Sequence, residues 1–175
     1  MSGKGSKARF ANGIIATVLV AFFLIHAALG SLSGVVGYKS PFTILVWAGV
    51  AIVVAHVVAS IITSREQLND SERPPSPRKK RHLALKWATG ALLAVLAVVH
   101  IVGMRMWGAD AVQSTVTGVA LTIVLATVLC WHICVGMKSM LVDVGWSKGL
   151  LTPLRIVVIA LAVVFVVMAI AASML

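Results

Sequence analysis

Apolar residues form five continuous stretches along the chain, separated by shorter polar segments. Each stretch is long enough to cross a hydrocarbon layer of about 30 Å, which takes about 20 helical residues. A transmembrane β-barrel would instead alternate apolar and polar positions along every strand. The pattern therefore predicts an all-α integral membrane five-helix bundle, a single transmembrane domain over residues 1–175, with helices over about 10–36, 42–64, 83–104, 112–137 and 151–174.

The composition agrees with this pattern, because 60% of the residues are hydrophobic and only 11% are charged. The polar segment 65–82, REQLNDSERPPSPRKKRH, contains prolines and charges and is predicted to be a cytoplasmic loop. No stretch remains for a separate soluble domain. The two cysteines, Cys130 and Cys134, lack the C-x-x-C-H spacing of covalently attached haem and are interpreted as packing residues.

The net charge of +10 is unevenly distributed between the two sides of the predicted membrane. The side that holds the N-terminus carries nearly all basic residues, whereas the other side carries only Lys39 and Arg105. Cytoplasmic loops are enriched in Lys and Arg, so the N-terminus is predicted to be cytoplasmic and the C-terminus outside. We expect a multi-pass protein of the inner (cytoplasmic) membrane. The basic run 77–82 is interpreted as a lipid-facing topology determinant, and no nucleic-acid partner is expected.

Four of the five histidines lie inside the predicted spans, one on each of the first four helices: His26, His56, His100 and His132. Ionisable residues within a membrane are costly and usually functional. The histidines are 30 residues apart in the first half of the chain and 32 apart in the second. This near-equal spacing indicates a duplicated two-helix unit followed by one extra helix.

The depths of these histidines separate them into two levels. Counted from the nearest cytoplasmic charge, His26 and His100 lie about 21–25 Å deep, and His56 and His132 about 9–13 Å deep. Two imidazoles at one height on facing helices form the ligand set of a bis-histidine haem b. We predict an outer haem b held by His26 and His100 and a cytoplasmic-side haem b held by His56 and His132. The alternative is that the neutral rings only pack between helices.

Small residues lie next to these histidines along the helices. Gly30 follows His26 by four residues and Gly136 follows His132 by four, so each shares a helix face with its histidine. A macrocycle needs such room on the ligand face. Glycine and alanine are also common wherever membrane helices pack, which is the competing interpretation.

The segment after the last of these histidines has the spacing H-x-x-x-G-x-K-x-x-x-x-D-x-G, formed by His132, Gly136, Lys138, Asp143 and Gly145. This spacing resembles the membrane cytochrome b anchors of the succinate dehydrogenase/fumarate reductase family. In that family a haem-ligand histidine is followed by Gly, a basic residue, Asp and Gly at the same positions. The stretch K-W-A-T-G at 86–90 resembles the family's basic turn ending in Ser/Thr-Gly. Residues 10–64 join the resemblance only through the repeat and the histidines.

The resemblance implies a subunit that is not catalytic alone. It implies electron transfer between a membrane quinone, menaquinone or ubiquinone, and an iron–sulfur subunit and a flavoprotein subunit docked on the cytoplasmic face. Segment 138–149 is the candidate docking surface. The quinone-site candidates are Lys86, Trp87 and Asp143. Three basic residues at the expected depths of the haem edges are candidates to pair with propionates, or alternatively interfacial anchors: Lys39, Arg105 and Lys138.

Two features differ from the family. Its two-haem, five-helix anchors take ligands from helices 1, 2, 4 and 5, whereas here the histidines lie on the first four helices. Trp87 also stands where the family usually has an arginine beside the quinone. The alternatives are a dihaem cytochrome b of another respiratory oxidoreductase (hydrogenase, formate dehydrogenase or b561-type) and a haem-free anchor. A transporter is disfavoured because the predicted spans contain no acidic residue.

Overall fold

The structure, a computed structural model, describes residues 7–36, 42–69 and 74–174. Within them every long element is a helix and no strand is present, which confirms the all-α class. Five helices are long and apolar enough to cross a membrane. The elements are α1 (Lys7–Val36), α2 (Phe42–Leu68), α3 (Pro77–Ser114), α4 (Val116–Val144), the short 3-10 helix η1 (Lys148–Leu150) and α5 (Leu151–Ala172).

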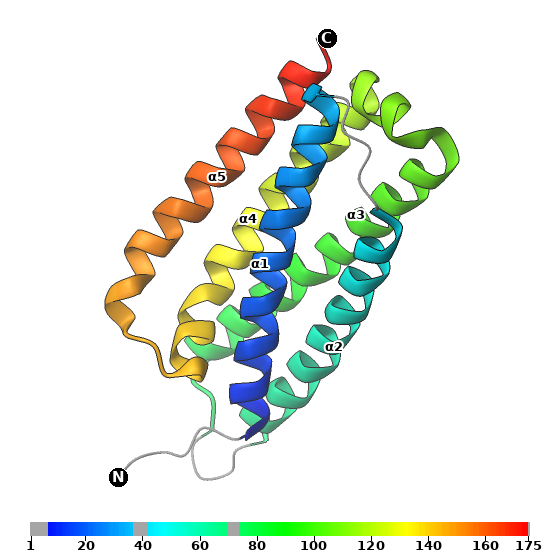
Figure 1. Ribbon diagram of the computed structural model, residues 1–175. Coiled ribbons are helices and arrows are strands. Elements are labelled where there is room, and N and C mark those ends of the chain that lie inside the picture. The colour runs from blue at the N-terminus through cyan, green and yellow to red at the C-terminus, as the bar shows by residue number, and fades with distance from the viewer. Residues whose placement is uncertain (1–6, 37–41, 70–73, 175) are drawn as a thin grey trace.

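The five long helices run alternately up and down, so the two chain ends lie at opposite ends of the bundle (Figure 1). One end holds the starts of α1, α3 and α5 and the ends of α2 and α4. We call it the basic end, because its described cations are Lys7, Arg9, Arg65, Arg78, Lys79, Lys80, Arg81, Lys86, Lys138, Lys148 and Arg155. The opposite end is called the far end.

The helices do not pack uniformly. Helix α1 packs against α2, α4 and α5, and α4 packs against α3 and α5, whereas α2 packs mainly against α1. The most tightly buried apolar cluster lies between α4 and α5, where Met137, Leu141 and Val158 are 3%, 1% and 8% exposed. The tight seam of the bundle is therefore on the α5 side, away from α2.

The outer surface of the bundle is apolar. Ile44, Trp47 and Val95, for example, are 79%, 63% and 62% exposed. Helices that are apolar on their outer faces as well as their inner ones are typical of membrane spans, because lipid tails contact the outer apolar side chains, whose exposure to water would be unfavourable. This surface agrees with a multi-pass membrane protein.

The predicted loop over 65–82 is wrong over much of its length, because α2 continues to Leu68 and α3 begins at Pro77. The backbone N–H of Lys79 donates to the Ser76 hydroxyl at 3.3 Å, which is a helix N-cap. Proline is favoured at the first helical position, where its missing N–H costs nothing. The basic run 77–82 therefore forms the first turns of α3.

The predicted ends of the third and fourth helices also differ from the structure. Helix α3 passes residue 104 and reaches Ser114, with a kink at Gly108 (φ 81, ψ 163). Helix α4 passes residue 137 and ends at Val144, because Gly145 adopts the left-handed conformation (φ 84) and closes the helix. The segment 138–149 is consequently divided between α4, its cap and η1.

Candidate functional site

The four membrane histidines are half-buried and lie on α1, α2, α3 and α4. His26 and His100 are electrostatic neighbours, close enough for a charge on one ring to act on the other. His56 and His132 are likewise electrostatic neighbours. The structure thus brings together the same two pairs that the depth comparison gave. Their role as ligands stays a prediction.

Two of these rings have an unpartnered nitrogen. Nδ1 of His56 and Nδ1 of His100 are buried and have no hydrogen-bond partner in the part of the chain that the structure describes. Buried polar atoms are almost always hydrogen-bonded, so each exception needs an explanation. Nδ1 is the nitrogen that a hydrogen-bond partner usually holds when Nε2 of a histidine binds a metal, and the described residues supply no such partner to His56 or His100.

His132 differs from these two because Thr89 of α3 holds it. The Thr89 oxygen lies 2.9 Å from Nδ1 of His132. The single hydroxyl proton of Thr89 points to the backbone carbonyls of Leu85 and Lys86, at 2.9 and 3.1 Å. If the Thr89 oxygen accepts from Nδ1–H, the lone pair of the His132 ring lies on Nε2. Nε2 of His132 would then be the nitrogen available to a metal.

Glycines provide close approach at some positions and space at others. A Cβ at Gly90 would lie 3.2 Å from Cε1 of His132, so a glycine there lets the ring approach α3. A Cβ at Gly30 or at Gly136 would meet nothing within 4 Å. Each of these two glycines shares a helix face with a histidine one turn away, His26 or His132. Each of these two glycines therefore leaves open space on its helix, one turn from a histidine.

The space next to Gly49 of α2 is filled by a side chain. A Cβ there would lie 2.5 Å from the Phe22 ring of α1. Phe22 in turn stacks with His26, with ring centroids 6.0 Å apart and planes 9° apart. Gly49 thus accommodates an aromatic ring that helps to orient His26.

A polar cluster lies at the basic end, next to the His56–His132 pair; its members are Arg9, Lys86, Ser139 and Asp143. The ammonium of Lys86 donates to the Ser139 hydroxyl at 2.7 Å. Asp143 is an electrostatic neighbour of both Lys86 and Arg9. Lys86 also acts electrostatically on His56 and on His132. Lys86 therefore connects the polar cluster to the histidine pair.

Of the three quinone-site candidates, Lys86 and Asp143 lie together in the polar cluster. Trp87 points toward α2, because its indole N–H donates to the Ser64 hydroxyl at 3.1 Å. This bond joins α3 to α2, which otherwise packs mainly on α1. The structure therefore brings two of the three candidates into one cluster and gives Trp87 a bridging position.

The two described candidates for pairing with propionates lie on the surface of the bundle. Arg105 and Lys138 are exposed, and Lys39 lies outside the described residues. The half-buried Lys86, which the sequence suggested only for the quinone site, acts electrostatically on both His56 and His132. A second half-buried cation, Arg155, donates to the Cys134 carbonyl at 2.9 Å and ties α5 to α4.

The cysteines and the remaining donors do not form a metal centre of higher ligand number. Cys130 and Cys134 are both free. Within the described ranges, no group of three or more His, Cys, Asp or Glu side chains converges. Structural zinc sites need four such ligands, and catalytic zinc sites need three. Each histidine pair alone supplies fewer ligands than either class of zinc site needs.

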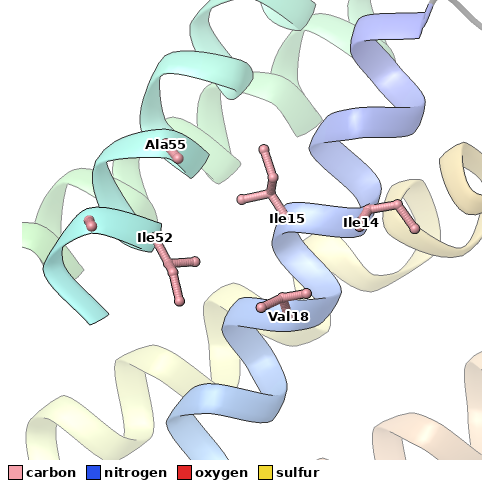
Figure 2. Close-up of a pocket in the computed structure, with 6 residues that line it drawn as sticks. Ile14, Ile15, Val18, Ile52 and Ala55 are labelled. Atoms are coloured by element: carbon pink, nitrogen blue, oxygen red, sulfur yellow. The ribbon is translucent and has the colours of Figure 1, made fainter. Parts of the chain in front are cut away.

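An apolar groove of about 320 Å³ runs between α1 and α2, lined by Ile14, Ile15, Val18, Ala51, Ile52 and Ala55. Figure 2 shows Ile15 of α1 and Ile52 of α2 in the space between the two helices. Its lining has no ionisable group, so the groove supplies shape for a hydrocarbon chain and no chemistry of its own.

Sequence reasoning missed Thr89, Ser139 and Arg9 as members of the site. Thr89 lies in the K-W-A-T-G stretch, but its role depends on which residues of α4 face it. The signal that could have found it is the helical spacing from Lys86 to Thr89, which puts both residues on one face of α3. To pair Thr89 with His132, the register between α3 and α4 must also be known, and the sequence does not give it.

Comparisons with known proteins give no further guide. We find no protein-family model, no curated protein and no solved structure that matches this chain.

Proposed function

We propose that this chain is the dihaem cytochrome b membrane anchor of a succinate dehydrogenase/fumarate reductase-type complex in the inner membrane. The observation that carries the proposal is the pairing of four half-buried histidines from four helices, His26 with His100 and His56 with His132. The motif that begins at His132 supports the family assignment. The N-terminus is proposed to lie in the cytoplasm, so that the basic end faces the partner subunits.

Each histidine pair would hold one haem b, whose iron supplies one-electron chemistry when bound. The protein's contribution is to fix the rings and to exclude water. Thr89 holds His132 through Nδ1, and Phe22 stacks on His26. The open space at Gly30 and Gly136 lies one turn from one histidine of each pair. Two such sites at two heights would carry electrons through the bilayer.

We further propose that the polar cluster binds the headgroup of menaquinone or ubiquinone. The Lys86 ammonium offers donors to a quinone oxygen, and the Asp143 carboxylate is a group that can hold a proton. Both are half-buried, and Lys86 is an electrostatic neighbour of the His56–His132 pair. A quinone here would exchange electrons with the nearer haem and protons with these side chains.

The haem prediction is tested on the purified full chain by reduced-minus-oxidised spectra and by haem-to-protein stoichiometry. His132→Ala and His26→Ala should each remove one of two haems. The control is His82→Ala, because His82 is exposed and belongs to neither pair. Loss of both haems from a folded variant, or of neither, would contradict the two-level pairing. A wild-type protein without any haem spectrum would favour the haem-free anchor.

The partner prediction is tested by purifying the complex from membranes under mild detergent. A flavoprotein subunit and an iron–sulfur subunit should co-purify with the chain. If haem is present but these subunits are absent and other redox subunits are found, the chain belongs to another respiratory oxidoreductase. The two experiments therefore test haem binding and the identity of the partner subunits independently.

A further inference from the structure

We infer that Thr89 is a positioning residue that sets the tautomer of His132 and thereby lowers the reduction potential of the iron bound to it. The effect on the potential rests on the proposed haem ligation, whereas the tautomer does not. The tautomer of His132 can be observed in the protein without bound haem.

The orientation of the Thr89 hydroxyl is fixed by its own helix. Thr89 is only 2% exposed, and its oxygen is 2.9 and 3.1 Å from the carbonyls of Leu85 and Lys86. If the hydroxyl donated to His132 instead, its oxygen would face two carbonyl oxygens with no proton between them. The arrangement is stable only when the proton points to the carbonyls and the lone pair points to Nδ1 of His132.

The rings of His56 and His100 lack this support. Nδ1 of His56 and Nδ1 of His100 have no hydrogen-bond partner among the described residues. A hydrogen bond from the outer nitrogen of a histidine ligand raises the basicity of the nitrogen that binds metal. A more basic ligand stabilises the ferric state more than the ferrous state. Thr89 should therefore act on the His56–His132 site and not on the His26–His100 site.

The first arm of the test is a potentiometric titration of the haem-loaded full chain. Thr89→Val keeps the shape and removes the acceptor, and Thr89→Ser keeps the acceptor. If the hydrogen bond favours the ferric state tenfold, Thr89→Val raises one midpoint potential by about 59 mV for a one-electron couple. The second midpoint and both midpoints of Thr89→Ser should match the wild type. Thr89→Ala serves as a second variant without the acceptor.

The matched control is Thr127→Val. Thr127 makes the same bond to its own helix, to the Ile123 carbonyl at 2.8 Å, but is exposed. It should leave both potentials unchanged. The inference is overturned if Thr89→Val shifts neither potential or both equally, or if Thr89→Ser behaves as Thr89→Val.

The second arm applies to protein isolated without haem. NMR of ¹⁵N-histidine-labelled full chain distinguishes the two tautomers, and the loss of one signal in His132→Gln assigns His132. The Nδ1–H form is expected in the wild type, and a mixture in Thr89→Val. A wild-type His132 in the Nε2–H form contradicts the inference. A haem-free protein with the Nδ1–H form contradicts the proposed function but supports this one.

Discussion

Two glycines allow the proposed haem binding to be tested separately from helix packing. Gly30 and Gly136 each lie one turn beyond a histidine, and an added Cβ meets nothing at either position. Gly136→Ala should lower haem occupancy at the His56–His132 pair only, and Gly30→Ala at the His26–His100 pair only. Each variant is the control for the other. The measurement is haem stoichiometry, with the midpoint potential of the remaining haem identifying the pair that was lost.

The folding stability of Gly30→Ala and Gly136→Ala should rise, whereas their haem occupancy should fall. Alanine in place of glycine inside a helix should stabilise the haem-free protein by about 0.5–1 kcal/mol, because glycine loses more backbone freedom on folding. Lower haem content in a protein of equal or greater stability would therefore come from lost space. Full occupancy in both variants would show that the open space is not used by a macrocycle.

At the residue scale, the four histidines could be predicted from the sequence, whereas their surroundings could not. Spacing along each helix gives the depth of His26, His56, His100 and His132 without any knowledge of packing. The roles of the other residues depend on how neighbouring helices face each other. Lys86 illustrates this, because it is the predicted cytoplasmic charge nearest to His100 along the helix, yet its ammonium is half-buried and donates to the Ser139 hydroxyl of α4.

At the scale of the elements, hydropathy predicted the number and class of the helices, and capping residues decided their ends. Helix α3 starts at Pro77 after the Ser76 cap, although the segment is strongly basic. Helix α4 continues through Lys138 and Asp143 until Gly145. Polar side chains do not end a helix, since its backbone hydrogen bonds are internal, so a hydropathy minimum marks the bilayer boundary and not the helix boundary.

The α4–α5 seam should be the element contact most sensitive to truncation. Leu141 is 1% exposed and packs with Met137 and Val158. Leu141→Ala should destabilise the bundle by about 2 kcal/mol, at the low end for buried leucines, because the unfolded helices of a membrane protein remain in lipid.

The matched control is the adjacent Val142→Ala, because Val142 is 49% exposed and should cost no more than about 0.5 kcal/mol. Unfolding in denaturing detergent, followed by circular dichroism, measures both variants. Equal effects of the two substitutions would mean that lipid-facing and seam positions contribute alike.

At the scale of the whole molecule, the two ends of the bundle differ strongly in charge. The basic end carries almost every described cation, and the far end carries Arg105. The polar cluster and the His56–His132 pair lie toward the basic end, and the two chain ends lie at opposite ends of the bundle (Figure 1). Orientation in the membrane therefore decides which face the proposed quinone site and partner surface share.

Orientation can be measured with single cysteines in a chain whose own thiols are replaced by Cys130→Ala and Cys134→Ala. Ser76→Cys lies at the basic end and Thr117→Cys at the far end, and both positions are exposed. Because Lys and Arg are retained on the cytoplasmic side, a membrane-impermeant maleimide should label Thr117→Cys in intact cells. It should label Ser76→Cys only after permeabilisation. The reverse labelling pattern would mean that the polar cluster faces away from the cytoplasm. A flavoprotein on the cytoplasmic side could then not reach the polar cluster.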